Sequence, residues 1–223
     1  MQSFGQRQAL IVFGKNPLAG HVKTRLARSI GEIPAAALYR AFLLDSLEAF
    51  STLDVDLRLY LAPSNAAVDP QVDAASPDFQ LQYGDGLGER MSNAIKESFD
   101  AGYTTVGIVG SDHPSLPVNI LRQGFTDVRN GNVVIGPSAD GGYYFLALDR
   151  HQPQLFSGIQ YGRPDVLDAT VCKARMSHMD VTLLDQWYDV DTIGDLRRLT
   201  AELRADPDLC PRTREAMKGL EIF

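Results

Sequence analysis

Cysteine and histidine are scarce in this sequence. Only Cys172 and Cys210 occur among the 223 residues, and the four histidines show no metal-ligand spacing. Zinc sites are built from such residues at short, regular spacings, so we do not expect one. Two cysteines without a secretion signal predict free thiols in a reducing cytoplasm.

Long hydrophobic runs are missing too. A membrane-spanning helix needs about 20 apolar residues in succession, and no run in this sequence comes close to that length. The start, MQSFGQRQALIVFGK, holds one short apolar run, and no small-residue cleavage site follows it. We therefore expect a cytoplasmic protein with no membrane span.

Positive charge is the third shortage. Lysine and arginine number 21 against 28 aspartates and glutamates, which gives a net charge of −7 and a pI near 5.0. Because no basic stripe stands out, nucleic acid is not expected as a partner. An anionic small ligand would then need local cations or a bound metal.

What the sequence does contain is an alternation of strand-like and helix-like segments, in a chain that is 44% hydrophobic. This pattern predicts an α/β fold with a mostly parallel sheet and helices on both faces. Two strand-like segments, 132–138 and 143–149, are so close in sequence that one antiparallel strand is expected. The other expected strands are 9–14, 56–62, 79–84, 105–110 and 180–184, and the expected helices are 34–51, 87–101, 117–129, 164–177 and 192–204.

The domain organisation follows from the same pattern. No linker is long enough to force two domains, so residues 1–223 are predicted to form one domain, with 205–223 as a C-terminal helical extension. The stretch 63–78 is rich in proline, serine and aspartate, which predicts a surface loop.

The loop after the first strand, GKNPLAGHVKTRLA (14–27), carries three cations, Lys15, Lys23 and Arg25, within eleven residues. Free backbone N–H groups in a loop that leads into a helix suit a phosphate. The loop matches neither GxxxxGK[ST] nor GxGxxG. Composition alone therefore leaves a phosphate site and an ordinary solvated basic loop equally open.

A second polar stretch, GSDHPSLP (110–117), ends the strand 105–110. Asp112 could be a ligand of Mg²⁺ or Mn²⁺, which prefer oxygen donors, and His113 could act as a base. The alternative is that Asp112 only caps the turn and that Pro114 starts the next helix.

Two further stretches are polar at strand ends. In WYDVDTIGDL (187–196), Asp189 and Asp191 point the same way if the segment is extended, although both could instead serve as helix caps. In GPSADGGYYFLAL (136–148), the paired glycines after Asp140 allow a ligand to approach the backbone closely, or simply form a hairpin turn.

These stretches together, with YGDGLGERMSNAI (83–95), resemble a bacterial family of uncharacterised proteins with the nucleotide-diphospho-sugar transferase fold. Its members are labelled glycosyltransferase-A-like, or are described as similar to the molybdenum cofactor and phospholactate guanylyltransferases. The resemblance runs from about residue 8 to residue 204. It implies a single Rossmann-like three-layer domain that binds a nucleoside di- or triphosphate through Mg²⁺ or Mn²⁺.

The resemblance also implies roles for individual residues. Asp112 and Asp191 would hold the metal, with Asp189 as a weaker candidate, while Lys23 and Arg25 would stabilise charge and Asp140 could act as a base. The resemblance assigns nucleotide binding to a larger set: Lys15, Gly20, Thr24, Gly84, Asp85, Leu87 and Gly88.

The chain departs from the family pattern at two points. Members commonly have Cys at the position of His113, which argues against a catalytic role for this histidine. The segment YGR (161–163) stands where WST is usual. The implied activity is metal-dependent glycosyl transfer from a nucleotide-sugar to a small-molecule acceptor. The alternatives are nucleotidyl transfer with release of pyrophosphate, and nucleotide binding without turnover.

Overall fold

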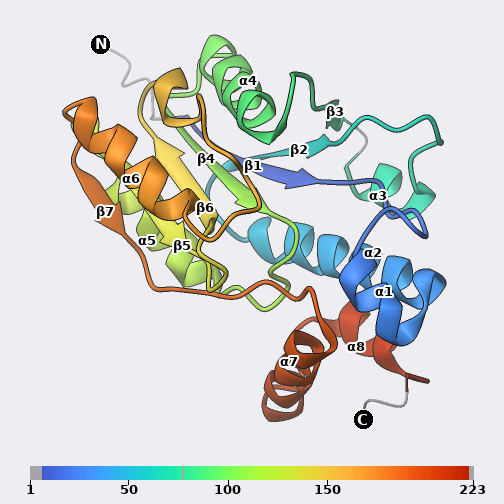
Figure 1. The fold of residues 1–223 in the computed structure, drawn as a ribbon. Coiled ribbons are helices and arrows are strands. Elements are labelled where there is room, and N and C mark those ends of the chain that lie inside the picture. Colours follow the sequence, from blue (N-terminus) through green and yellow to red (C-terminus); the bar gives the residue numbers. More distant parts are fainter. Residues whose placement is uncertain (1–6, 77, 221–223) are drawn as a thin grey trace.

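The computed structural model describes residues 7–76 and 78–220, which form a seven-stranded sheet with helices on both faces (Figure 1). The strand order is β3-β2-β1-β4-β6-β5-β7. The strands are β1 (Gln8–Gly14), β2 (Asp56–Leu61), β3 (Gln80–Leu81), β4 (Thr105–Gly110), β5 (Val133–Pro137), β6 (Tyr143–Leu148) and β7 (Val181–Leu183). The helices are α1 (Thr24–Ile30), α2 (Glu32–Phe50), α3 (Pro70–Ala75), α4 (Leu87–Asp100), α5 (Val118–Asp127), α6 (Val166–Met176), α7 (Ile193–Ala205) and α8 (Pro211–Met217), with a 3-10 turn, η1, at Pro153–Leu155.

The sheet is parallel except for one strand. β1 pairs in parallel with β2 and β4, and β5 pairs in parallel with β7. β6 is antiparallel to both of its neighbours, β4 and β5. The prediction of a mostly parallel sheet with one antiparallel strand is therefore confirmed.

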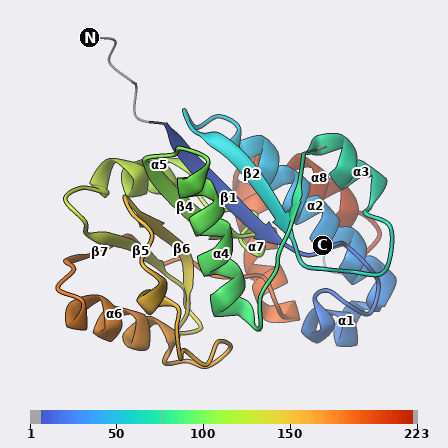
Figure 2. The same cartoon turned by 90° about the horizontal axis from the view of Figure 1, so that it is seen from above.

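Alternate residues of β1 pack into two separate hydrophobic cores, one on each face of the sheet. Ala9 and Ile11 pack with Met91 and Ile95 of α4, together with residues of α6, on one face of the sheet. Leu10 and Val12 pack on the other face with residues of α2 and α5. Figure 2 shows α4 and α6 on one side of the strands and α2 and α5 on the other. Burial on both faces explains the continuous apolar run of β1.

A third apolar cluster lies beside the sheet rather than on it. It joins Leu26 of α1 and Phe42 of α2 to Leu196 of α7 and Met217 of α8. Figure 1 shows α1, α7 and α8 together at one end of α2. The packing of α7 against the N-terminal helices matters for the site, because Lys23 directly precedes α1 and Asp191 precedes the N-cap residue of α7.

Three expectations about the elements need correction. The stretch 63–78 is not only loop, because Asp69 caps α3 by accepting a hydrogen bond from Gln71 N. β3 has two residues rather than six. The helix expected from residue 34 begins at Glu32, and Gly31, with φ 89°, separates it from α1. Among the described residues, no helix is long and apolar enough to cross a membrane.

Candidate functional site

A cleft of about 690 Å³ opens at the carboxyl ends of β1 and β4. From β1 the sheet continues to β2 and β3 on one side and to β4 on the other, so the cleft lies where the strand order reverses. This is the position at which open α/β sheets bind ligands. Gly14 and Gly110, the last residues of the two strands, both line it.

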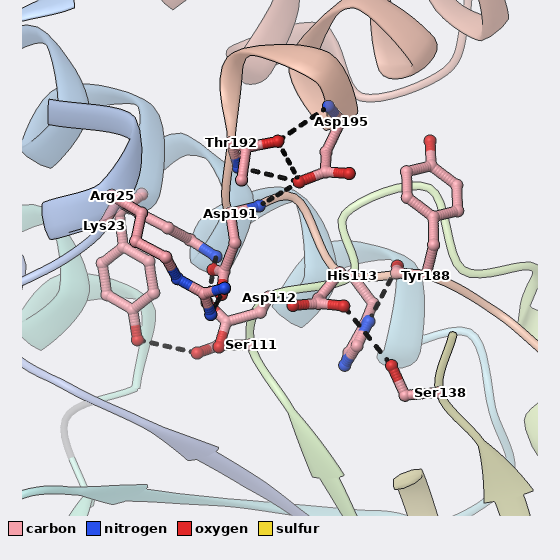
Figure 3. Close-up of polar contacts among 12 residues, drawn as sticks. Lys23, Arg25, Ser111, Asp112, His113, Ser138, Tyr188, Asp191, Thr192 and Asp195 are labelled. Carbon is pink, nitrogen blue, oxygen red and sulfur yellow. Dashed lines mark hydrogen bonds and ion pairs between the residues drawn. The ribbon is translucent and has the colours of Figure 1, made fainter. Parts of the chain in front are cut away.

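Lys23 occupies the centre of the polar side of the cleft. Its ammonium nitrogen lies 2.5 Å from Asp112 Oδ1 and 2.9 Å from Asp191 Oδ1 (Figure 3). Arg25 donates a further hydrogen bond to Asp191 Oδ2. The Lys23 side chain is only 2% exposed, whereas that of Asp112 is 44% exposed, so a buried cation joins two carboxylates that still reach solvent.

The backbone at Lys23 adopts a left-handed conformation with φ 47° and ψ 42°. Residues with a Cβ avoid this region, and a residue is held there only when its surroundings stabilise it. The rings of Tyr39 and Phe42 lie 5.9 and 5.8 Å from the Lys23 ammonium. The ion pairs and these two rings together hold the lysine in place.

The charges of this cluster shift one another's pKa. Burial alone would lower the pKa of Lys23, but Asp112 and Asp191 outweigh it, and the pKa is raised. Burial would likewise raise the pKa of Asp112, but Lys23 outweighs it, and the pKa is lowered. Both groups are therefore charged across the neutral range.

Asp191 is positioned by the start of α7. Thr192 is the N-cap residue, and its side chain accepts a hydrogen bond from Asp195 N while the Asp195 carboxylate accepts one from Thr192 N. The Asp191 backbone N–H also donates to Asp195 Oδ2, at 3.2 Å. Because Thr192 makes the cap, the Asp191 carboxylate turns into the cleft, and the alternative in which Asp191 caps the helix does not apply.

Tyr39 connects the loop after β1 to the end of β4. Its hydroxyl accepts a hydrogen bond from Lys15 N at 2.8 Å and lies 2.7 Å from Ser111 Oγ. Ser111 directly precedes Asp112. This one hydroxyl therefore fixes the spacing between the cationic loop and the acid, a role that the helical pattern of α2 did not reveal.

The opposite wall carries the second pair of acids. Asp140 is exposed, lines the cleft, and accepts a hydrogen bond from Gly142 N at 2.9 Å. Burial, together with the nearby Asp191 charge, raises the pKa of Asp189. Asp189 accepts a long hydrogen bond of 3.4 Å from Ser138 Oγ.

His113 also lines the cleft, although most of its side chain is buried. Its Nδ1 lies 2.9 Å from the backbone oxygen of Tyr188, which can only accept, so Nδ1 carries the proton. Burial lowers the pKa of His113, which keeps the ring neutral. The histidine therefore ties the end of β4 to the segment that carries Asp189 and Asp191.

An aromatic pair closes the cleft on the side of α4. The hydroxyls of Tyr143 and Tyr161 lie 3.2 Å apart, and both residues line the cleft. A Cβ on Gly88 would lie 2.7 Å from the Tyr161 ring and 2.6 Å from Phe156 O, so glycine is needed there for packing. Arg90 and Arg163 add positive charge to the same rim.

The structure brings most of the sequence-predicted residues together, but not all. Gly20, Gly84, Asp85 and Gly88 do not line the cleft, and a nucleotide-binding role for them stays a prediction. The predicted residues that line the cleft are Lys15, Lys23, Thr24, Arg25, Leu87, Asp112, Asp140 and Asp191, together with the weaker candidate Asp189.

The carboxylates of Asp112 and Asp191 fit a divalent cation whose other ligands come from the substrate and from water. Carboxylate oxygens of Asp112 and Asp191 both lie within 2.9 Å of a single cationic nitrogen, so a cation can reach both. Across the described chain, no three His, Cys, Asp or Glu side chains are placed to hold a metal ion. Two carboxylates completed by phosphate oxygens and water are a common arrangement for Mg²⁺.

The family model described as "Uncharacterized protein conserved in bacteria (DUF2064)" matches residues 43–163. The chain belongs to this family. A solved protein from Desulfovibrio desulfuricans G20, provisionally assigned as a nucleotide-diphospho-sugar transferase, is 35% identical to it, with a TM-score of 0.85. That match covers 93% of this chain and 94% of the other, so it includes the regions of Lys23 and Asp191 that lie outside the family model. The family expected from the motifs is thereby confirmed.

More distant structures share the fold. CMP:2-keto-3-deoxy-manno-octonic acid synthetase, solved with CTP, is 12% identical with a TM-score of 0.55, and the match covers 89% of this chain and 99% of that one. A 4-diphosphocytidyl-2C-methyl-D-erythritol synthase from Anaerococcus prevotii DSM 20548 is 13% identical with a TM-score of 0.58, over 90% of this chain and 97% of the other. No curated protein matches the chain. The comparisons show that the chain has the nucleotide-diphospho-sugar transferase fold.

Proposed function

We propose that the protein is a metal-dependent transferase that takes a sugar from a nucleotide-sugar and passes it to a small-molecule acceptor. One observation carries the proposal. Lys23, Asp112 and Asp191 converge in a cleft at the point where the strand order reverses. The 35% identical protein, provisionally assigned to the same class of transferase, supports it.

The chain's own residues suit the departure of a diphosphate. Lys23 and Arg25 supply positive charge beside Asp112 and Asp191, and fixed charges of this kind stabilise the negative charge that develops as the bond breaks. When bound, Mg²⁺ or Mn²⁺ would neutralise the diphosphate oxygens as a Lewis acid. Lys23 and Arg25 would donate hydrogen bonds to the diphosphate oxygens.

The acceptor would enter from the Asp140 wall. Its hydroxyl oxygen forms the new bond to the anomeric carbon, while the bond from that carbon to the diphosphate oxygen breaks. The electron pair of the broken bond leaves with the nucleoside diphosphate, and the hydroxyl proton passes to Asp140. Asp140 can take this role because it is exposed in the cleft and is held by Gly142 N.

A product screen tests the proposal. Purified protein is incubated with each nucleotide-sugar and each nucleoside triphosphate, with Mg²⁺ or Mn²⁺, and with a panel of acceptors. Nucleoside diphosphate and pyrophosphate are then measured separately. Release of nucleoside diphosphate supports glycosyl transfer. Pyrophosphate instead indicates nucleotidyl transfer, and metal-dependent nucleotide binding without either product indicates a binding protein.

Two variants test the residue assignment. Asp112→Asn and Asp191→Asn should each weaken Mn²⁺-dependent nucleotide binding at least tenfold, because a hard cation loses one of two protein carboxylates. Asp168→Asn, an exposed acid in the first turn of α6 outside the cleft, is the matched control. If Asp112→Asn keeps the wild-type metal dependence, the assignment of this ligand is wrong.

A further inference from the structure

Gln82 is a buried polar residue that lines the cleft. The proposed mechanism gives it no role. It directly follows β3, is 5% exposed, and its backbone N–H donates to Leu61 O at 2.9 Å. Its side-chain Nε2 donates two hydrogen bonds, to Gly14 O at 2.8 Å and to Tyr60 O at 3.0 Å. The side chain thus reaches the last residue of β1.

These two bonds fix the orientation of the amide. An amide nitrogen has two hydrogens, and both are used here. Turning the amide over would place Oε1 against two carbonyl oxygens, which repel it, and would leave Nε2 without acceptors in a buried place. Oε1 therefore stays where it is, as a hydrogen-bond acceptor that cannot become a donor.

Oε1 has no partner of its own. No described residue donates to it. It is nevertheless accessible to solvent, because the fully buried polar atoms without a partner do not include it. Since Gln82 lines the cleft, the accessible oxygen faces a place where a ligand can lie. A ligand that covers this acceptor and excludes water from it pays a cost unless the ligand itself donates a hydrogen bond to it.

The cleft that Gln82 lines has room for a flat ring. Ala62, Gly86 and Leu87 line the same cleft, and these residues are small or apolar. The Gly14 carbonyl that it contacts is followed directly by Lys15, where the cationic loop begins. Lys23, Arg25 and Gln82 line the same cleft, and Gln82 lies on its β3 side.

We infer that Gln82 Oε1 accepts a hydrogen bond from an exocyclic amino group of the nucleobase, so that the site selects amino-bearing bases over their oxo or hydrogen counterparts. The inference rests on the proposed nucleotide-binding function. An oxo group at the same place would face Oε1 with a second acceptor, and a hydrogen would leave Oε1 unpaired. Neither loss can be relieved by turning the amide.

Matched nucleotide pairs test the inference on the wild-type protein. Binding of cytidine and uridine diphosphates, adenosine and inosine diphosphates, and guanosine and inosine diphosphates is measured by calorimetry with Mn²⁺. In at least one pair, the nucleotide with the amino group should bind at least about tenfold more tightly than its counterpart. A loss of this size is expected when a ligand leaves a polar group of the site without a hydrogen-bond partner. Pairs that all agree within twofold, with binding intact, overturn the inference but leave the proposed function standing.

Two variants separate base selection from a purely structural role. Gln82→Met keeps the length of the side chain and removes its oxygen. The ratio of the affinities for the amino nucleotide and its counterpart should therefore fall to about twofold. Asn93→Ala removes the bond from Asn93 Nδ2 to Tyr83 O and loosens the neighbouring loop, so it should weaken both members alike and keep their ratio.

Two results would count against the inference, and a variant that does not fold leaves the wild-type measurement to decide. If Gln82→Met lowers both affinities equally and keeps the ratio, Gln82 only ties the strands together and the inference is wrong. If Gln82→Met does not fold, the wild-type ratios with the Asn93→Ala control still decide between the outcomes. If the wild type binds no nucleotide with any metal, the proposed function fails first and the inference falls with it.

Discussion

At the scale of single residues, the charged side chains of the cluster are buried to different degrees, and this decides how much each substitution lowers stability. The Lys23 side chain is 2% exposed, while those of Asp112 and Asp191 are 44% and 22% exposed. A buried charge without a partner is far more costly than a partly solvated one. Leaving the Lys23 charge unpaired therefore costs more free energy than leaving the charges of Asp112 and Asp191 unpaired.

Removing the acids should accordingly destabilise the protein more than removing the lysine. The double variant Asp112→Asn/Asp191→Asn leaves a buried ammonium unpaired and should lower the free energy of unfolding by about 3–5 kcal/mol. Lys23→Met removes the buried charge itself and should cost about 1–3 kcal/mol. Urea denaturation measures both, with Lys96→Met, from an exposed pair with Asp100, as the control. An equal loss in the two variants would contradict this account.

The pKa shifts predict a plateau in the pH dependence of this stabilisation. Asp112 has a folded pKa below its ordinary 3.8, so its contribution is present above that pH and is lost as the pH falls further. Lys23 has a pKa raised above 10.5, so its contribution is present below that pH and is lost as the pH rises. The difference in unfolding free energy between wild type and Lys23→Met should be flat between these limits and shrink outside them. A difference that changes steadily from pH 5 to pH 9 would speak against the ion pairs as its source.

Sequence reasoning reached the charged residues of the site more easily than the neutral ones. Lys23 and Asp112 stand out because each lies in a polar stretch that follows an apolar strand. Tyr39 and Gln82 do not, because one lies within a helix on its apolar side and the other looks like an ordinary strand residue. Their roles depend on which backbone atoms lie within 3 Å, and only the folded chain sets those distances.

At the scale of the elements, the capping box of α7 connects local stability to the site. The Asp195 carboxylate accepts hydrogen bonds from both Thr192 N and Asp191 N. The cap therefore does two things: it starts the helix and orients the residue just before it.

Loss of this cap should be visible in both stability and binding. Thr192→Ala should lower the free energy of unfolding by about 1 kcal/mol, the usual effect of losing a capping hydroxyl. It should also weaken Mn²⁺-dependent nucleotide binding several-fold, because Asp191 is less well held. Thr200→Val, further along α7, should leave binding unchanged, since Thr200 bonds only within the helix, to Leu196 O. Unfolding and calorimetric titrations of the two variants provide the comparison, and equal binding losses would refute the link.

Short elements were the hardest to predict from sequence. α3 was missed inside a polar stretch, although Asp69 followed by Pro70 is a typical helix start. β3 is only two residues long, and Gln82, which follows it, donates a side-chain hydrogen bond to Tyr60 O of β2. The long apolar strands and α4 agree with their expected limits within a residue or so, since burial there fixes the pattern.

At the scale of the whole molecule, the C-terminal segment is anchored by one buried acid. Asp45 of α2, with 2% of its side chain exposed, accepts hydrogen bonds from the backbone N–H groups of Arg212 and Thr213 at the start of α8, at 3.1 and 2.8 Å. This contact caps α8 from a helix more than 160 residues away in sequence.

Asp45→Ala should therefore undock α8 without disturbing the cleft. The two N–H groups lose their acceptor, which should cost about 1–3 kcal/mol. Hydrogen exchange at 211–217 should accelerate, while nucleotide binding stays as in the wild type. Glu48→Ala, which removes only an exposed partner of Arg212, should change stability by about 0.5 kcal/mol or less. Unchanged exchange in Asp45→Ala would show that the apolar contacts of α8 suffice.

The arrangement of the sheet was predictable in outline because its rules are general. Alternating strands and helices require a parallel sheet, and the short connection before β6 requires a reversal of direction. The packing of α1, α7 and α8 around one end of α2 was not predictable, because it depends on apolar contacts between segments at opposite ends of the chain.

The separation of Lys23 and Asp191 along the chain also sets an order of events during synthesis. The two residues are 168 positions apart, and a ribosome adding about 5–20 residues per second needs roughly 8–34 seconds to cover that distance. A nascent chain that already contains the first six strands still lacks the second acid. By the proposed function, the emerging protein would bind a metal–nucleotide complex in this cleft only after Asp191 has left the ribosome, when the sheet can already be in place.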